Sequence, residues 1–508
     1  MARLIGWLCL ALFALAPAAA AAADWRAAET EHFIIYTDQS DKDLEKMATR
    51  LEKMDGLLRM ATGISDEVEP VKVRIYVVDD TAAVGKAVGQ TGSGILGFYT
   101  SNIFGPFAVT PAKTPSYAGG FDADMVLYHE YAHHFMLQYF PASYPQWYVE
   151  GFAELIGSSK FLPDGRIGYG MPAKHRGDHL AFAWAPLQEV LMKPAHKVHN
   201  FDLYGQGWAI THYLTFSDER APQMRQYLTA LTQGKSPEEA AKAFGNISKL
   251  NQDAAKYLRA GSFAYKPVDV KIEEPVIRRV RPLSAGEAAL IPEIIAFRDE
   301  SLGWYRKEGD KKRALEFRER NLADIRSKAA IHANDPFALH LLGEAEYAAG
   351  NYAAAEAAAD RLLALKPDHV RGRVRKALAM LQNAPAAERA GRADEARKLV
   401  LAANRDNPDD VLPLVGYYQT FNLAGEQAPE QAVNGLAAAV QTLPGDERIR
   451  QMMVDEMAAQ KKWRYAIAYL APLANSPHET PMRDAARKQM EELEAELAKE
   501  TGATPAAS

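Results

Sequence analysis

The stretch His129-Glu130-Tyr131-Ala132-His133 governs the interpretation of this 508-residue chain. If it forms a helix, the four-residue spacing puts His129 and His133 one turn apart on the same face. Two imidazoles in that position can share one metal ion, and Glu130 between them is a candidate general base. The flanking residues are mostly apolar, which favours a buried helix. The alternative is a chance occurrence of three fixed letters.

A second segment, Glu150-Gly151-Phe152-Ala153-Glu154, supplies what the first one lacks. On a helix, Glu150 and Glu154 share a face, so Glu150 is placed to be a third metal ligand. Glu154 would accept a hydrogen bond from the far ring nitrogen of a ligand histidine, which we expect to be His129. Gly151 would let this helix approach the first one closely. The alternative is a solvated carboxylate pair, but apolar neighbours favour a pair turned toward a cation.

These two segments, with Trp147-Tyr148-Val149 before the second, resemble the gluzincin metallopeptidases. The resemblance is to the peptidase MA-like domains of bacterial envelope proteins with tetratricopeptide repeats, and it covers roughly residues 30–265. It implies one Zn²⁺ per chain bound by His129, His133 and Glu150, with Glu130 as the catalytic base. The G-x-M-E-N segment of the aminopeptidase branch is absent, so the resemblance favours an endopeptidase.

The segment Tyr204-Gly205-Gln206-Gly207 is similar to the one that opens a helix in gluzincins. There the tyrosine hydroxyl points at the tetrahedral intermediate, which implies that Tyr204 is a second catalytic residue that donates to the developing oxyanion. The alternative is a core tyrosine whose hydroxyl bonds to the backbone. His212, two helical turns later, is a further candidate donor.

The N-terminus has the layout of a secretory signal peptide. Arg3 precedes an apolar run and an alanine tract that ends at Ala23, and the run is too short to span a bilayer. We therefore expect residues 1–23 to be removed and the protein to be periplasmic or secreted; the alternative is a retained membrane anchor. Cys9, the only cysteine, lies in this segment, so the mature chain would need no disulfide.

The composition limits the remaining possibilities. A chain of this length should hold two or three domains, and a net charge of −6 with interspersed signs gives no footprint for nucleic acid. Alternation predicts strands at 32–37 and 71–78, with a helix over 41–60 between them. The resemblance to the zinc peptidases implies that residues 107–109 form an edge strand that pairs with an extended substrate; the alternative is that they only close the sheet.

The second half of the chain reads as helical repeats. Loop prolines recur at an average interval of about 35 residues, close to the tetratricopeptide period. These prolines are Pro336, Pro367, Pro408, Pro444 and Pro477, and Gly350, Ala355 and Pro367 match Gly391, Ala396 and Pro408 at equal offsets, with an insertion near Pro385. Such hairpins bury their apolar faces only by stacking. The alternative is an irregular helical bundle.

The expected fold is an α+β zincin-like metallopeptidase domain followed by an all-α tetratricopeptide-like helical repeat domain. The expected boundaries are a signal peptide (1–23), the metallopeptidase domain (24–265), a linker (266–285), a helical connection (286–335), the repeats (336–480), and a capping helix with a disordered tail (481–508).

Two function classes remain. The first is a periplasmic or secreted zinc endopeptidase with a polypeptide substrate, whose repeats recruit a protein partner. The second is an inactive peptidase-like scaffold of the envelope in which the repeats bind protein partners. Retention of the histidine pair, Glu130, Glu150 and Tyr204 favours the enzyme.

Overall fold

The computed structural model describes most of the chain. The described residues are 25–65, 71–89, 95–102, 104–113, 122–140, 144–177, 184–193, 198–199, 201–299, 301–476 and 480–501. The expected signal peptide and the end of the expected tail lie outside them. Within the described part, no helix combines the length and the apolar character that crossing a bilayer requires.

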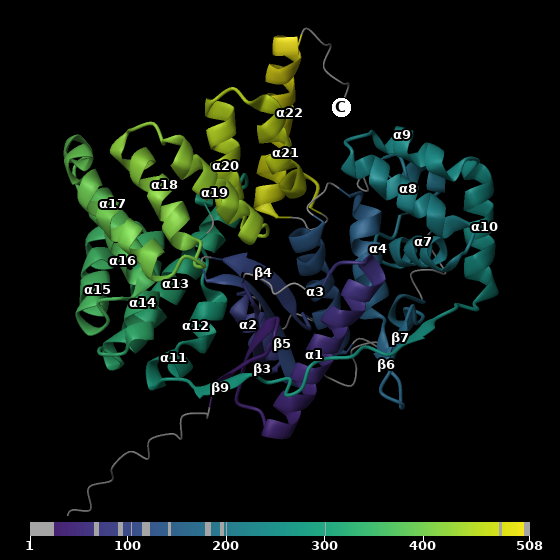
Figure 1. The fold of residues 1–508 in the computed structure, drawn as a ribbon, viewed down its shortest axis with the longest axis horizontal. Helices are drawn as coiled ribbons and strands as arrows, with labels where there is room; N and C mark the ends of the chain where they lie inside the picture. The colour runs from purple at the N-terminus through teal and green to yellow at the C-terminus, as the bar shows by residue number, and fades with distance from the viewer. Residues whose placement is uncertain are drawn as a thin grey trace, which may run out of the picture.

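A six-stranded sheet lies at the centre of the molecule (Figure 1). Its order is β4-β5-β3-β2-β1-β9, in which β2, β3 and β5 are parallel and the other pairs antiparallel. The strands are β1 (Arg26–Glu29), β2 (Phe33–Thr37), β3 (Val73–Asp80), β4 (Phe98–Asn102), β5 (Gly105–Lys113) and β9 (Arg279–Pro282). The predicted strands at 32–37 and 71–78 are confirmed as β2 and β3.

The expectation of an edge strand at Phe107–Val109 is wrong. These residues belong to β5, which pairs with β3 on one side and with β4 on the other. The edge is β4 instead. Strand propensity reports how well a residue suits a strand and not which strands lie beside it, so it cannot order β4 and β5 in the sheet.

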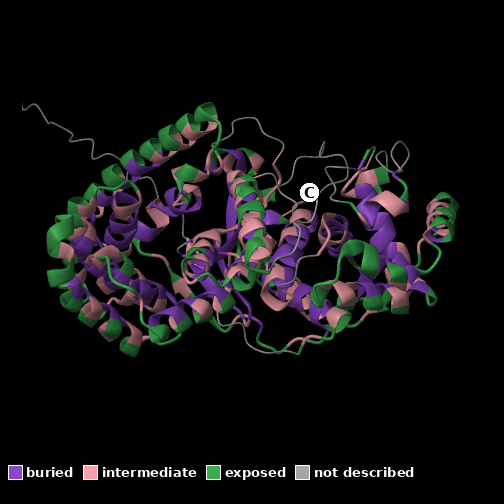
Figure 2. Ribbon diagram, turned by 90° about the horizontal axis from the view of Figure 1, so that it is seen from above, coloured by how far each residue is buried: buried purple, intermediate pink, exposed green. Residues whose placement is uncertain are grey.

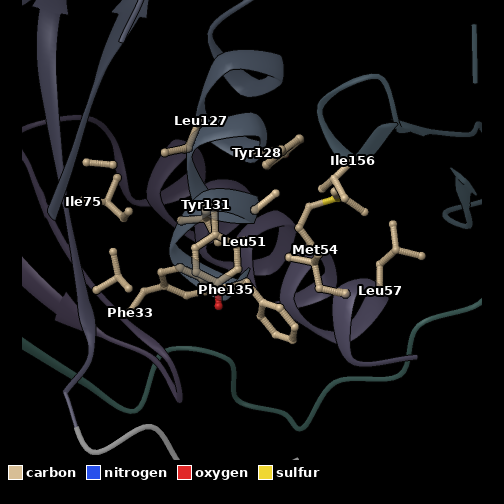
Figure 3. Close-up of a cluster of buried hydrophobic side chains, with 14 of the residues drawn as sticks. Phe33, Leu51, Met54, Leu57, Ile75, Leu127, Tyr128, Tyr131, Phe135 and Ile156 are labelled. Atoms are coloured by element: carbon tan, nitrogen blue, oxygen red, sulfur yellow. The ribbon is translucent and has the colours of Figure 1, made fainter. Parts of the chain in front are cut away.

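One face of the sheet packs on α1 (Asp41–Thr62) and α3 (Ala123–Tyr139). Alternate strand residues such as Phe33 and Ile75 point to this side, where they meet Leu51 of α1 and Phe135 of α3 (Figure 3). The side chains of Phe33, Leu51 and Phe135 are at most 1% exposed. This core fixes the position of α3, the helix that carries the histidine pair.

The opposite face of the sheet packs on the beginning of the helical half. Tyr36, Tyr76 and Phe107 point to this side and join one apolar cluster with Ile294 and Ile325. The helices involved are α2 (Thr81–Ala87), α12 (Ile291–Ala296), α13 (Glu308–Ile331) and α14 (Pro336–Ala348). The sheet is thus shared by both halves of the chain.

A second lobe follows α3 in the sequence. It contains α4 (Gln146–Gly157), α6 (Leu187–Val190), α7 (Gly205–Phe216), α8 (Arg220–Thr232), α9 (Pro237–Ala241) and α10 (Ile247–Ala260). A small sheet of β6 (Lys160–Phe161), β7 (Ile167–Tyr169) and β8 (Lys266–Val268) lies below it. Figure 1 shows this lobe on one side of the central sheet and the repeats on the other.

The region expected to be a linker, 266–285, is part of the folded domain. Its first residues form β8, which pairs with β7, and residues 279–282 form β9, which pairs with β1. Proline and charge suggested a linker, but the partner strands lie so far away in the sequence that local composition carries no sign of them.

The helical half is a stack of antiparallel pairs. After α11 (Ala285–Ala289), α12, α13 and α14 it contains α15 (Tyr352–Leu365), α16 (Val370–Asn383), α17 (Arg389–Asp406), α18 (Leu412–Ala424), α19 (Glu430–Thr442), α20 (Glu447–Ala459), α21 (Trp463–Ala474) and α22 (Pro481–Thr501). Exposed residues follow the outer surface of this stack in Figure 2.

The predicted register is confirmed only in part. Ala355 and Ala396 are both fully buried. Gly350 ends a helix with φ at 79°, whereas Gly391 lies inside α17. The insertion near Pro385 lengthens the α16–α17 connection and moves the start of α17, so the two glycines are not equivalent.

Candidate functional site

The histidine pair lies on α3, as the spacing predicted. The Asp122 side chain caps this helix by accepting a hydrogen bond from the backbone N–H of Met125 at 2.7 Å. One turn separates His129 from His133, and their Nε2 atoms are 3.1 Å apart. Both side chains are almost fully buried. The two ring nitrogens therefore converge on one point.

Glu150 of α4 completes the group. This helix begins after Pro145, and its apolar residues pack it against α3 and α7. Glu150 Oε2 lies 3.3 Å from His129 Nε2 and 3.6 Å from His133 Nε2. The structure thus brings together the three expected metal ligands from two helices.

The three ligand atoms fit a zinc ion. A tetrahedral Zn²⁺ with ligands at about 2.0–2.1 Å spaces them about 3.3 Å apart. The three separations found here, 3.1, 3.3 and 3.6 Å, bracket that value. Two imidazoles and one carboxylate are also a donor set that zinc accepts. Among the described residues, His129, His133 and Glu150 form the group whose ligand atoms lie close enough together to hold a metal ion.

The group holds an ionised, buried carboxylate beside two imidazoles. Burial lowers the pKa of His129, but the Glu150 hydrogen bond and the nearby carboxylates outweigh it and raise the pKa to about 9. Burial raises the pKa of Glu150, but the two histidines outweigh it and hold that pKa well below its usual range. A buried carboxylate between two imidazoles thus draws positive charge to this point.

Glu154 lies behind the ligand His129, as expected. Its Oε1 is 3.4 Å from His129 Nδ1, on the far side of the ring from Glu150. The carboxylate is also held by His175 at 2.7 Å and by Arg176 at 2.5 Å. Burial raises the pKa of Glu154, but His175, His129 and Arg176 together lower it to about 2. Glu154 is therefore ionised and fixed, which orients the His129 ring.

Sequence reasoning missed His175 and Arg176 as partners of Glu154. Neither residue belongs to any of the motifs described above. Both lie in a short 3-10 turn, Lys174–Arg176, some twenty residues after Glu154. A turn of this kind has no periodicity that could have indicated its contact.

Glu130 and Tyr204 lie near the metal-ligand group. Glu130 and His133 line a pocket of about 440 Å³, which we call the metal-side pocket. Tyr204 immediately precedes α7, and its ring centroid is 6.2 Å from that of His129. The Arg176 guanidinium lies 4.6 Å from the centroid of the Tyr204 ring. Burial raises the pKa of the Tyr204 hydroxyl, so this group stays protonated.

Two other candidates have structural roles. Gly151 does not face α3; a Cβ there would lie 2.3 Å from Gly207 O and from Thr211 Oγ1, so this glycine lets α4 approach α7. His212 is buried, with Nε2 2.8 Å from Gly170 O and Nδ1 2.9 Å from the Tyr257 hydroxyl. His212 is therefore a core histidine and not a second donor of the site.

The helical repeats close over the metal-side pocket. Gly445 of the α19–α20 loop lies against the Tyr99 hydroxyl of β4, and Pro472 and Leu473 of α21 line the same pocket. The Gln146 side chain, at the start of α4, donates to Ser476 O at 2.9 Å. Both halves of the chain thus build the wall of this pocket.

No family model matches the chain, and no curated protein matches it. Solved structures do match. The tetratricopeptide repeat protein TTC0263 of Thermus thermophilus is 22% identical, over 36% of this chain and 94% of that one, with a TM-score of 0.31. A MamA double mutant is 19% identical over 36% and 93%, with a TM-score of 0.23. Yeast Tom70 is 14% identical over 74% and 72%, with a TM-score of 0.24.

These matches bear on both halves of the expectation. The matched structures named here are tetratricopeptide-like repeat proteins, and the second half of this chain is likewise built of successive helices. The expected zinc endopeptidase is contradicted at this point, because the three matches named above are repeat proteins and point to a protein-interaction scaffold. The alternative, an envelope scaffold whose repeats bind protein partners, replaces that expectation.

Proposed function

We propose that this chain is an envelope scaffold whose helical repeats bind protein partners and whose N-terminal α+β domain carries one Zn²⁺ ion. One observation carries the proposal: every second helix of the stack, from α14 to α20, contributes to an open pocket of about 420 Å³, which we call the repeat pocket. Stacked helical hairpins present binding surfaces of this kind. The pocket is large enough for several side chains of a partner.

The zinc part of the proposal is supported by the convergence of His129, His133 and Glu150 on one point. We include in this part of the proposal that residues 24–265 have the expected zincin-like fold. When bound, the ion would supply a divalent charge that offsets the buried carboxylate. The three residues would then link α3 to α4, and Glu154 would orient the ring of His129.

The envelope location is supported by the sequence of residues 1–23, with its short apolar run and small residues before Asp24. An envelope scaffold meets its partners outside the cytoplasm, in an oxidising compartment. After removal of residues 1–23 the chain has no cysteine, so its fold does not depend on disulfides there.

The partner-binding part is tested by capture from an envelope extract on the immobilised mature protein. Gln419 of α18 lines the repeat pocket, so Gln419→Trp should fill the pocket and abolish capture. Gln431→Trp, on the exposed surface of α19, is the matched control and should capture as the wild type does. Equal capture by all three proteins would overturn the proposal.

The zinc part is tested by metal analysis of the same protein. We expect one zinc per chain in the wild type, loss of zinc in His133→Ala, and retention in His134→Ala, whose side chain contacts Tyr99 instead. Zinc content equal in wild type and His133→Ala would remove the metal from the proposal. If the wild type cleaved casein and Glu130→Gln did not, the scaffold function would be overturned in favour of a peptidase.

A further inference from the structure

Three rings from distant parts of the chain pack one against the next where the central sheet meets the repeats. Phe104, between β4 and β5, has its ring centroid 5.4 Å from that of His340 on α14. The centroid of the His340 ring lies 5.1 Å from that of His369, which directly precedes α16. Phe104 and His340 are buried, and His369 is half-buried. This series of rings connects the sheet with the first turn of α16.

His369 is the N-cap of α16. Its Nδ1 accepts a hydrogen bond from the backbone N–H of Gly372 at 3.0 Å. Serine, threonine, aspartate and asparagine are the usual residues at this position, where a side-chain oxygen accepts the bond. An imidazole can accept at Nδ1 only while that nitrogen carries no proton, because both nitrogens of the charged ring are donors. The cap of α16 therefore exists only while His369 is neutral.

The surroundings of His369 keep its ring neutral at ordinary pH. Burial is the largest cause of a pKa lowered to about 4, and three nearby groups lower it further: His340, Lys366 and Arg371. Asp368 acts in the opposite direction but more weakly. Two acids packed nearby are engaged by arginines, Glu344 by Arg375 and Asp410 by Arg371.

The cap is lost on acidification and not on alkalinisation. A free histidine has a pKa of 6.5, against about 4 for His369 in the folded chain. The unfolded chain therefore binds this proton more tightly than the folded chain does. The stabilisation is fully present above pH 6.5 and is lost as the pH falls toward 4.

The helix start that His369 caps forms part of the wall of the repeat pocket. Arg371, Val374 and Arg375 of α16 line this pocket. Arg371 Nε also donates to Asp410, which lies between α17 and α18, at 2.8 Å. A first turn that frays when its cap is lost carries these side chains with it. The shape of the pocket thus depends on the cap.

We propose that His369 is a pH-sensitive latch: the neutral imidazole holds the start of α16, and with it the wall of the repeat pocket, in place, and protonation in acid releases that helix start. The consequence for partner capture rests on the protein-binding function proposed above. The latch itself needs no partner, so the two can be tested apart.

The test compares the full mature protein with His369→Asn, because asparagine is a good N-cap that does not titrate. Hydrogen exchange of the first turn of α16, followed by mass spectrometry, reports the cap directly. The ratio of the exchange rates, wild type over variant, should rise by roughly tenfold or more from pH 7.5 to pH 4. His199→Asn, at an exposed histidine, is the matched control and should exchange as the wild type does at both pH values.

Capture of a partner from the envelope extract is measured on the same proteins. At pH 4 about half of the folded chains carry the proton on His369, so capture by the wild type should fall by about half or more relative to His369→Asn. An exchange ratio that is the same at both pH values would overturn the latch. A ratio that rises while capture stays equal would overturn its effect on the pocket wall. Failure to capture any partner at pH 7.5 would overturn the protein-binding function, and the exchange ratio would still decide the latch.

Discussion

Gly151→Ala tests how closely α4 and α7 are packed. The added Cβ would lie 2.3 Å from Gly207 O and from Thr211 Oγ1, and 2.6 Å from the Gly207 carbonyl carbon. Carbon and oxygen atoms in contact need about 3.4 Å or more. The two helices would therefore have to separate by about 1 Å. Because the obstacle includes backbone, no side-chain rotation can relieve it.

The energetic consequence follows from this overlap. Overpacking of a core costs about 1–3 kcal/mol, and a clash with backbone belongs at the upper end. Alanine regains about 1 kcal/mol of helix propensity over glycine. We expect Gly151→Ala to lower the free energy of unfolding by about 2 kcal/mol. It should also weaken zinc binding, because Glu150 is the adjacent residue and moves with α4.

Urea unfolding followed by circular dichroism measures the first effect, and a competitive zinc titration the second. Gly435→Ala is the control: it lies inside α19, and its Cβ would meet Leu414 at an ordinary 3.6 Å. This variant should be as stable as the wild type or more so. If Gly151→Ala equals or exceeds the wild type in stability, the packing of α4 on α7 is not as close as the structure has it.

Three further predictions follow from individual contacts. Glu154→Gln should weaken zinc affinity by roughly tenfold or more, because Glu154 orients the His129 ring. Glu491→Gln, on the exposed side of α22, is the control and should leave the zinc affinity unchanged. Equal affinities of the two variants in a zinc titration would show that Glu154 does not orient His129. Leu436→Ala should lower the free energy of unfolding, measured in urea, by about 2–5 kcal/mol, because this side chain of α19 is fully buried. Leu401→Ala, at a side chain that is 45% exposed, should lower it by under about 1 kcal/mol. Similar losses in the two variants would contradict the burial of Leu436. The pKa of Glu344 is about 2 in the folded chain against 4.5 for a free glutamate, so its stabilisation is complete above pH 4.5 and is lost as the pH falls toward 2. The difference in unfolding free energy between wild type and Glu344→Gln should shrink by up to about 3 kcal/mol over that range, and a constant difference would show that Glu344 is not held by Arg375 and His340.

The parts of the fold predicted correctly depend on local patterns. Alternation located β2 and β3, and a four-residue spacing placed His129 and His133 on one face of a helix, because both are periodicities of the backbone itself. The convergence of Glu150 was predicted from its apolar neighbours. These features need no knowledge of distant residues.

The parts predicted wrongly depend on distant contacts. β9 pairs with a strand some 250 residues earlier, and nothing within 279–282 indicates that partner. The same holds for His175 and Arg176, which reach Glu154 from an irregular turn, and for Gly151, whose close neighbour is α7 and not α3. Tertiary packing decides such contacts, so local sequence does not encode them.

Because the apolar cluster on the second face of the central sheet takes residues from both halves, the two halves are not separable modules. A fragment cut after residue 265 would lose β9 and expose Tyr36, Tyr76 and Phe107 to water, and a fragment starting at residue 286 would expose Ile294 and Ile325. Neither piece is a sound choice for expression or for domain exchange between homologues.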